Sequence, residues 1–350
     1  MRAITVVPGK KDSADLEEFD APSESEGGVL VETLAVGVCG TDLEIAAGEY
    51  GWAPAGHERL VLGHESIGRV RTAPAGSGLS PGDYVVGIVR RPDPVPCYNC
   101  AAGEWDFCRN GQYTEHGIKS LDGFMRQQYR AEPDALVKVD SALGELGVLL
   151  EPTSVVAKAW EQAELAGKRA TWHPKTAVVT GAGPIGLLAA LIGVQKGLDV
   201  HVFDQVSEGL KPDLVHALGA SYHTGPIENS VDEPDIIIEC TGVPGLVFDA
   251  IEHIGPGGVV CLTGVSPTGR ELSIDAGLVN RSMVLANESV VGSVNANRRH
   301  YEQAAEALAK AEKNWLTRLI TRRVPMEQFA SALERQPEDV KVVIQIAEAG

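Results

Sequence analysis

The chain has 350 residues, a length that fits two domains with separate cores better than one ordinary domain. Hydrophobic residues make up 44% of it and charged residues 22%, which argues against intrinsic disorder. No run approaches the ~20 consecutive apolar residues of a membrane helix, and the N-terminus lacks the apolar core of a signal peptide. We therefore expect a soluble, cytoplasmic protein with no membrane partner.

The charge balance is strongly acidic, with 48 Asp and Glu residues against 30 Lys and Arg and a formal net charge of −18. Such a charge repels nucleic acids and anionic surfaces, so a nucleic-acid partner is disfavoured. The acids are spread along the chain, which indicates an acidic surface and not one acidic tail. This surface is typical of a salt-adapted, halophilic protein; the alternative is a mildly acidic enzyme from an ordinary environment.

The first 150 residues contain short apolar runs separated by Gly, Pro and Ser clusters, a pattern that predicts an irregular β-rich domain. The expected strands lie in segments 1–9, 27–38, 60–70 and 82–89. The pattern becomes helical over residues 154–165 and then leads into a polar connection. We place the end of this domain at residue 158.

From Thr176 onward strands alternate with helices, which predicts an α/β domain with a doubly wound parallel sheet over residues 159–296. Its strands are expected within segments 176–183, 199–205 and 235–242, and its helices at 184–197 and 211–219. The segment 300–320 is strongly helical, and 341–347 has the pattern of a strand. We expect residues 297–350 to rejoin the first domain.

A glycine-rich motif, GAGPIG at residues 181–186, directly follows an apolar strand and opens a helix. Gly181 permits a tight turn, Gly183 lets the backbone approach a pyrophosphate, and Gly186 allows close packing of helix on strand. The phosphate would lie at the helix N-terminus. The surrounding strand, helix and downstream acid favour a dinucleotide site over a glycine-rich turn without a ligand.

The downstream acid is Asp204, which ends the second strand of this domain about 20 residues after the glycines. A carboxylate there accepts hydrogen bonds from the adenosine ribose and repels a 2′-phosphate, and no Arg follows it closely, although Lys211 is near in sequence. We therefore expect NAD to be favoured and leave NADP open. The residues assigned to cofactor binding are Gly181, Gly183, Pro184, Ile185, Gly186 and Asp204.

Residue types that bind zinc recur in the first domain. Cys39 precedes a Gly-Thr-Asp sequence, His64 and Glu65 follow a glycine, and Glu151 follows an apolar stretch. A catalytic zinc needs three protein ligands and keeps a fourth position open for water or substrate. Each residue taken singly is more often a core residue, so only the combination indicates a metal site.

The six cysteines do not read as a disulfide framework, because a cytosolic chain of this size does not need one. Cys97, Cys100 and Cys108 crowd one loop. Cys240 and Cys261 lie inside apolar strings, and we expect them to be inert core residues.

These motifs, in this order, resemble the zinc-dependent medium-chain dehydrogenase/reductase superfamily across essentially the whole chain. Further segments at 90–92, 106–108, 115–118, 122–125 and 292–295 look like its archaeal glucose dehydrogenase group. The resemblance implies a GroES-like fold for the β-rich domain, a Rossmann fold for the second, an active site in the interdomain cleft, and an aldose substrate.

The resemblance also implies roles for individual residues. The matched positions are Cys39, His64 and Glu65 as catalytic zinc ligands, Glu151 as a zinc ligand or sugar contact, Glu115 and Asn295 as partners of sugar hydroxyls, and Thr41 as the hydroxyl that passes on the substrate proton.

The cysteine loop matches a structural-zinc lobe that has four cysteines in the superfamily. Cys97, Cys100 and Cys108 match three of them, while the first falls on Pro94. Asp93, beside that position, is the candidate fourth ligand. The alternative is a lobe without metal.

The implied reaction is zinc-dependent oxidation of an aldose, D-glucose or a related sugar such as galactose, at C1 to the aldonolactone, with hydride transfer to NAD(P). A rival within the superfamily is a polyol, secondary alcohol or threonine dehydrogenase. A rival of another class is a non-catalytic nucleotide-binding module, which has no need of an open metal site. We expect a homo-oligomer, either a dimer or a tetramer.

Overall fold

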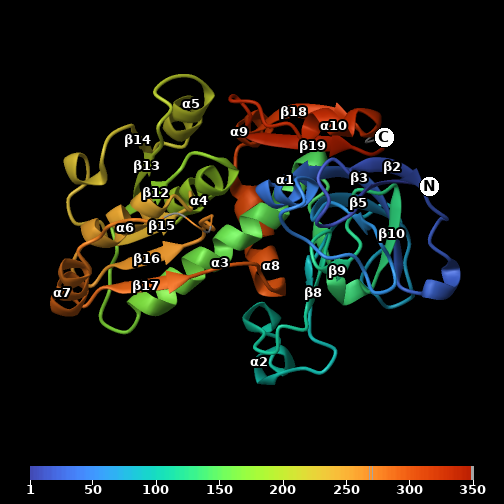
Figure 1. Cartoon of the computed structure of the whole chain (residues 1–350), viewed down its shortest axis with the longest axis horizontal. Helices are drawn as coiled ribbons and strands as arrows, with labels where there is room; N and C mark the ends of the chain where they lie inside the picture. The colour runs from blue at the N-terminus through green and yellow to red at the C-terminus, as the bar shows by residue number, and fades with distance from the viewer. Residues whose placement is uncertain (268, 270, 348–350) are drawn as a thin grey trace. The chain divides into compact units, whose positions relative to one another are not determined.

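The chain divides into two compact units in a computed structural model that describes residues 1–267, 269 and 271–347 (Figure 1). The first unit comprises Met1–Glu151 and Asn295–Gly350, and the second comprises Pro152–Val294. The sequence placed the divisions after residues 158 and 296. The first division lies earlier because helix α3 (Leu150–Gly167) begins before its recognisable helical pattern, so the chain changes unit in the first turn of this helix.

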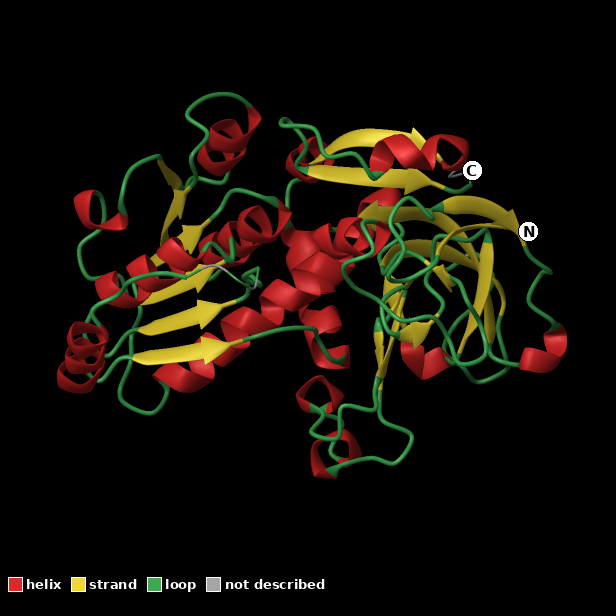
Figure 2. Ribbon diagram, viewed as in Figure 1, coloured by secondary structure: helices red, strands yellow, loops and turns green. Residues whose placement is uncertain are grey.

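The first unit is β-rich, as predicted (Figure 2). Its main sheet has seven strands in the order β11–β6–β5–β3–β19–β18, with β10 paired to β3. Their bounds are β3 Val29–Val38, β5 Glu65–Thr72, β6 Tyr84–Gly87, β10 Gln128–Ala131, β11 Leu136–Val139, β18 Ile320–Pro325 and β19 Lys341–Gln345. Two three-stranded sheets, β2–β1–β4 and β7–β8–β9, accompany it. Their bounds are β1 Arg2–Val6, β2 Asp15–Glu18, β4 Leu60–Val61, β7 Arg90–Arg91, β8 Thr114–His116 and β9 Ser120–Leu121.

Short helices fill the connections of this unit. The α-helices are α1 Gly40–Ala46, α2 Tyr98–Ala101, α8 Arg298–Lys310, α9 Lys313–Leu319 and α10 Phe329–Ala332, and the 3₁₀ turns are η1 Glu24–Glu26, η2 Trp105–Phe107, η3 Pro133–Ala135, η4 Gly144–Leu149 and η6 Met326–Gln328. The predicted helix 300–320 is thus two helices. It is interrupted where the backbone of Ala311 and Glu312 is extended.

The predicted strand 60–70 is also interrupted, and Gly63 explains why. Its φ of +89° lies in the left-handed region, and a Cβ there would come within 2.5 Å of Met125 Cγ. The chain before the glycine forms β4, which pairs with β1, and the chain after it forms β5, which pairs with β3. Because of this turn, the chain leaves the sheet β2–β1–β4, and Glu65 begins a strand of the main sheet with His64 just before it.

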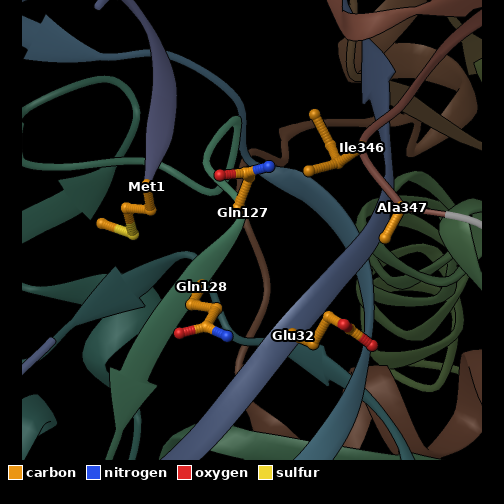
Figure 3. Close-up of a pocket in the computed structure, with 6 residues that line it drawn as sticks. All are labelled: Met1, Glu32, Gln127, Gln128, Ile346 and Ala347. Atoms are coloured by element: carbon orange, nitrogen blue, oxygen red, sulfur yellow. The ribbon is translucent and has the colours of Figure 1, made fainter. Parts of the chain in front are cut away.

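A pocket of about 220 Å³ lies beside the main sheet, lined by Met1, Glu32, Gln127, Gln128, Ile346 and Ala347 (Figure 3). The side-chain oxygen of Gln127 accepts a hydrogen bond of 2.8 Å from the backbone N–H of Arg2, and this bond holds the start of β1 in place. The pocket contains none of the residues predicted for catalysis.

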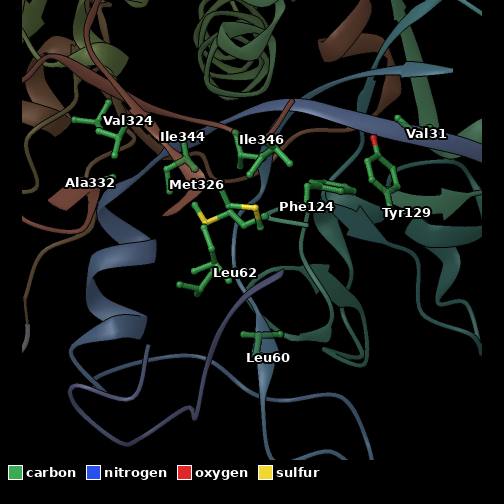
Figure 4. Close-up of a cluster of buried hydrophobic side chains, with 14 of the residues drawn as sticks. Val31, Leu60, Leu62, Phe124, Tyr129, Val324, Met326, Ala332, Ile344 and Ile346 are labelled. Atoms are coloured by element: carbon green, nitrogen blue, oxygen red, sulfur yellow. The ribbon is translucent and has the colours of Figure 1, made fainter. Parts of the chain in front are cut away.

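The C-terminal segment returns to the first unit, as the sequence predicted. Strand β19 pairs antiparallel with β3, and its side chains join those of Leu62 and Phe124 in one buried cluster (Figure 4). Ile344 is fully buried and Ile346 is 8% exposed. Burying such a side chain contributes about 1.5–3 kcal/mol, so residues at both ends of the chain stabilise the same core.

The second unit is the predicted parallel, doubly wound sheet, with strand order β14–β13–β12–β15–β16–β17. The strands are β12 Thr176–Thr180, β13 Asp199–Phe203, β14 Ser221–His223, β15 Ile236–Glu239, β16 Val259–Leu262 and β17 Ser289–Gly292. The connecting helices are α4 Pro184–Gln195, α5 Leu210–Ala217, η5 Ile227–Asn229, α6 Pro244–His253 and α7 Ala276–Ala286. From β12 the chain winds first toward β14 and then crosses to β15, which creates a switch point between β12 and β15.

Among the described residues, no helix combines the length and the apolarity required to cross a membrane.

Candidate active site

The predicted catalytic zinc ligands converge. Gly37 in β3 is the register partner of Glu65 in β5, so Cys39, just beyond the end of β3, lies beside His64 and Glu65 at the start of β5. One ligand atom from each of these three side chains lies within 4.8 Å of the other two. The imidazole and the carboxylate are buried and the thiol is half-buried. A thiol, an imidazole and a carboxylate are a donor set that zinc accepts.

His64 lies beside Asp42, in the first turn of α1. His64 Nδ1 lies 3.5 Å from Asp42 Oδ1, and both atoms are buried without a hydrogen-bond partner. Burial lowers the pKa of His64, but Asp42 and Cys39 outweigh burial and raise that pKa well above its usual value. A carboxylate behind a ligating histidine is the usual arrangement at metal sites, and it leaves Nε2 for the ion.

Glu65 is held by a buried lysine. Lys341 Nζ, in β19, lies 2.8 Å from Glu65 Oε1 and 2.6 Å from Oε2, and it also donates to the Val38 carbonyl at 3.2 Å. Burial lowers the pKa of Lys341, whereas Glu65 and Cys39 raise it by more. A Cβ at Gly37 would lie 2.1 Å from Glu65 Oε2, so only glycine leaves room for this carboxylate.

Glu151 and Thr41 are the remaining residues predicted near the metal. Glu151, in the first turn of α3, is buried and lies outside the three-atom cluster. Burial, together with the charges of Glu65 and Asp42, raises the pKa of Glu151 to about 7, although His64 and Lys341 act in the opposite direction. Its carboxyl group can therefore hold or release a proton near neutral pH. Thr41 lies half-buried in the first turn of α1, two residues after Cys39.

The structure also brings together the two residues predicted to bind sugar hydroxyls. Asn295 Nδ2 donates to Glu115 Oε1 at 2.7 Å, and Arg90 Nε donates to the same oxygen at 3.0 Å. Arg90 faces Glu115 across β7 and β8, and its guanidinium stacks on the Tyr113 ring at 3.8 Å. Glu115 Oε2 is therefore the oxygen that this arrangement leaves for a ligand.

The sulfur atoms of Cys97, Cys100 and Cys108 lie within 4.8 Å of one another around α2. Backbone N–H groups, that of Arg109 foremost, lower the pKa of Cys97 to about 6, while burial raises the pKa of Cys100 to about 11. Three convergent sulfurs fit a structural zinc. The fourth candidate, Asp93, lies outside this cluster, with Oδ1 accepting from the Val95 N–H at 2.8 Å and Oδ2 buried without a partner.

The other two cysteines have thiols whose pKa burial raises to about 12. Cys261 is fully buried, whereas Cys240 is half-buried and its thiol donates to the Ile238 carbonyl at 3.6 Å. A neutral thiol is a poor nucleophile and a poor ligand.

The glycine-rich motif connects β12 to α4 with the geometry that its sequence predicts. Gly181 has a φ of +90°, and a Cβ on Gly186 would lie 1.7 Å from the Gly181 carbonyl oxygen. A Cβ on Gly183 would meet nothing within 4 Å, so the protein leaves the space above it open. Gly183 caps α4 and Pro184 begins it, which points backbone N–H groups at that space.

Asp204 follows β13 and has several partners within the protein. Its Oδ2 accepts from the Ala182 N–H at 2.7 Å, and its Oδ1 accepts from the Val206 N–H at 3.1 Å. Lys211 Nζ lies 3.1 Å from Oδ2. Burial raises the pKa of Asp204, but these bonds lower it by more. The cation suggested by the sequence thus pairs with Asp204, which weakens the repulsion of a 2′-phosphate.

Sequence reasoning missed three side chains that position the site: Asp42, Arg90 and Lys341. Asp42 ends the Gly-Thr-Asp sequence after Cys39, and Arg90 begins the segment 90–92, but neither residue was assigned a role of its own. Lys341 opens an apolar strand, and a charged residue at the start of such a strand is the one signal that pointed to it. Its partner Glu65 is 276 residues away, a pairing that only the tertiary fold creates.

Comparisons with known proteins agree over both units. The family described as Glucose dehydrogenase C-terminus matches residues 144–346, and the Alcohol dehydrogenase GroES-like domain matches residues 25–141. The glucose 1-dehydrogenase of Methanocella arvoryzae is 41% identical over 99% of both chains. The chain belongs to the glucose dehydrogenase family. This places it in the zinc-dependent medium-chain dehydrogenases and confirms the predicted fold class.

Further family members are similar at full length. The glucose 1-dehydrogenase of Thermoproteus tenax is 41% identical, again over 99% of both chains. A solved structure, the Haloferax mediterranei glucose dehydrogenase in complex with NADP, zinc and gluconolactone, is 33% identical. It superimposes with a TM-score of 0.91 and covers 99% of this chain and 100% of its own. Family members from Haloterrigena turkmenica and Halobacterium salinarum are 36% and 38% identical over 97% and 93% of this chain.

Proposed function

We propose that this chain is a zinc-dependent dehydrogenase that oxidises D-glucose, or a related aldose such as galactose, at C1. A bound nicotinamide would supply the acceptor for the C1 hydride, the hydroxyl proton would leave to solvent, and the product would be the aldonolactone. The observation that carries the proposal is the convergence of Cys39, His64 and Glu65 in a chain similar over its full length to glucose 1-dehydrogenases. Zinc at this cluster would polarise the oxygen that is oxidised.

The protein side chains supply positioning and proton transfer. Thr41 would pass on the proton of the reacting hydroxyl, and the buried carboxyl group of Glu151 would bind the zinc or contact the sugar. Glu115 Oε2 would accept from a sugar hydroxyl, with Asn295 and Arg90 fixing the carboxylate through its other oxygen. A carboxylate and an amide suit a polyhydroxylated substrate, because each can form hydrogen bonds with hydroxyl groups that lose their water partners on binding.

For the cofactor, we propose that the motif at residues 181–186 binds the pyrophosphate of NAD or NADP. Asp204 favours NAD, since it can accept from the ribose hydroxyls, and Lys211 supplies a cation for the 2′-phosphate of NADP. We expect the enzyme to use both cofactors, with NAD preferred.

A second zinc is proposed at Cys97, Cys100 and Cys108, with Asp93 as the candidate fourth ligand.

We also propose a cytoplasmic homo-oligomer. All six cysteines are unpaired, which is usual where thiols are kept reduced. Helix α7 buries no residue, and Leu278, Val284 and Leu285 on it are 55–66% exposed, so a second copy covering this apolar face is the expected partner. Light scattering during size-exclusion chromatography tests this, and a monomeric mass would contradict it.

A substrate panel tests the activity. The purified protein is assayed with glucose, galactose, a polyol, a secondary alcohol and threonine, each with NAD and NADP, before and after chelation. We expect aldoses to give the highest kcat/KM and zinc to restore activity after chelation. A higher kcat/KM for the polyol or for threonine would favour the rival dehydrogenases. Nucleotide binding without turnover of any substrate would favour the non-catalytic module.

A further inference from the structure

A fully buried carboxylate lies at the switch point of the parallel sheet. Glu239 is the last residue of β15, and its register partner Thr180 is the last residue of β12. These two strands flank the place where the winding reverses, and the Glu239 side chain is 0% exposed. In open parallel sheets, ligands bind outside the carboxyl ends of the strands at this point.

Glu239 joins the loops that follow both of these strands. Its Oε1 accepts from the Thr180 hydroxyl at 3.2 Å, from the Thr241 N–H at 2.7 Å and from the Thr241 hydroxyl. The Gly242 N–H lies 3.1 Å from both carboxylate oxygens. Hydrogen bonds to an ionised acceptor are roughly twice as strong as those between neutral groups, so this carboxylate fixes the loop after β15 more firmly than an amide would.

The loop after the next strand, β16, joins the same cluster through the backbone. The Glu239 carbonyl accepts from the Thr263 N–H at 2.8 Å, from the Thr263 hydroxyl at 2.7 Å and from the Gly264 N–H at 3.1 Å. A Cβ on Gly264 would lie 2.8 Å from Glu239 Oε2 and 2.1 Å from the Gly242 nitrogen. The loops are therefore packed around the carboxylate without room for a side chain.

The same cluster reaches the glycine-rich motif. A Cβ on Gly181 would lie 2.9 Å from Thr241 Cγ2, so the turn after β12 rests against the loop that Glu239 holds. We propose that Glu239 is a positioning residue for the dinucleotide, because it fixes in advance the backbone of the three loops at the switch point. The proposal rests on the function proposed above. Fixing loops before binding saves the entropy of ordering them in the complex.

The opposite end of the same two strands offers a matched control. Asp235 precedes β15, and its Oδ2 accepts from the Lys175 N–H at 2.7 Å and from the Thr176 N–H at 3.0 Å, beside the start of β12. It joins β12 and β15 as Glu239 does, but at the amino ends of the strands, where no ligand binds in this class of sheet.

The test compares Glu239→Gln with Asp235→Asn in the full-length, zinc-loaded protein. Dissociation constants for NAD and NADP are measured by calorimetry without sugar, together with the KM values for cofactor and glucose, the zinc content and the unfolding midpoint.

In Glu239→Gln, the amide NH₂ group would face the Gly242 N–H, so that two hydrogen-bond donors meet without an acceptor. We expect Glu239→Gln to weaken binding of both dinucleotides at least tenfold and to raise the cofactor KM, with the glucose KM and zinc content within twofold of wild type. Asp235→Asn should lower the unfolding midpoint and leave cofactor binding within twofold.

Equal cofactor binding by Glu239→Gln and wild type would overturn the proposal, as would equal weakening by Asp235→Asn. If Glu239→Gln does not fold, Thr180→Val replaces it, because this buried side chain loses only the hydroxyl that donates to Glu239. Binding at least threefold weaker than wild type supports the proposal, and unchanged binding overturns it. If wild-type protein binds neither dinucleotide, the proposed function itself fails.

Discussion

Three carboxyl groups crowd the site around Cys39. Asp42 and Glu151 add two to that of Glu65, and the bases that face them are Lys341 and His64. The pKa values show the strain of this arrangement, since that of His64 is raised and burial raises that of Glu151 to about 7. A divalent cation relieves this strain, which is a physical reason to place zinc here.

We predict that Cys39→Ala removes most of the activity and leaves the fold intact. The thiol is half-buried at the start of α1 and contributes little to the core, while loss of a ligand removes the metal. A metal contributes several kcal/mol to catalysis, and each ~1.4 kcal/mol is tenfold in rate, so we expect a loss of about 100-fold or more. Zinc content, circular dichroism and kcat are measured together, with Cys261→Ala as the control. Turnover at the wild-type rate in verified zinc-free protein would contradict the assignment.

The other residue-scale prediction concerns Asp204 and cofactor choice. Removing the carboxylate in Asp204→Ala frees Lys211 to meet a 2′-phosphate and abolishes the repulsion. We expect the ratio of kcat/KM for NADP to that for NAD to rise about tenfold, or about 1.4 kcal/mol. Asp199→Ala, an exposed acid at the other end of β13, is the matched control and should leave the ratio unchanged. If wild type already prefers NADP more than tenfold and Asp204→Ala does not strengthen that preference, Asp204 does not face the ribose.

At the scale of elements, the cysteine lobe around α2 has little core of its own. Val95 and Tyr98 are 76% and 65% exposed, and Cys100 is the buried residue of α2. Such a segment depends on cross-links or a metal for its shape. A metal bound there would stabilise the protein without taking part in the reaction.

We therefore predict that Cys97→Ser lowers the unfolding midpoint by roughly 5–15 °C, as expected when a tightly bound ligand of the native state is lost. The kcat at 25 °C should stay within a few-fold of wild type. Metal analysis should fall from two zinc ions per chain to one. One zinc in wild type, unchanged by Cys97→Ser, would show that the lobe is empty.

The elements that could be predicted are those with a local signal. Strand β12, the glycine motif and α4 follow one another within 20 residues, and each glycine has the environment that its position predicts. The breaks at Gly63 and at Ala311 were missed, because periodicity continues across them and only the surrounding packing decides where the chain turns. In the site, the motifs predicted three residues that the fold brings together, Cys39, His64 and Glu65, whereas Lys341 and Glu239 act through contacts between distant segments.

For the molecule as a whole, the net charge of −18 is the property that the fold explains least. Many acids are exposed, Glu49, Glu58, Glu208 and Glu338 among them. Their repulsion destabilises the compact state in dilute buffer. The Debye length falls from about 10 Å at 0.1 M salt to about 3 Å at 1 M, so salt screens this repulsion.

We predict that the unfolding midpoint rises by several degrees between about 0.1 M and 2 M potassium chloride, because screening removes repulsion from the folded protein and acts less on the expanded chain. Thermal unfolding followed by circular dichroism measures it. A general effect of salt on apolar burial would raise the midpoint whatever the surface charge. The control is therefore a variant with Glu49→Gln, Glu58→Gln, Glu208→Gln and Glu338→Gln. If repulsion is the cause, this variant is more stable than wild type at low salt and gains less from added salt. If the unfolding midpoint of wild type does not change with salt, or rises equally in both proteins, the acidic residues are an ordinary solvated surface and not a salt adaptation.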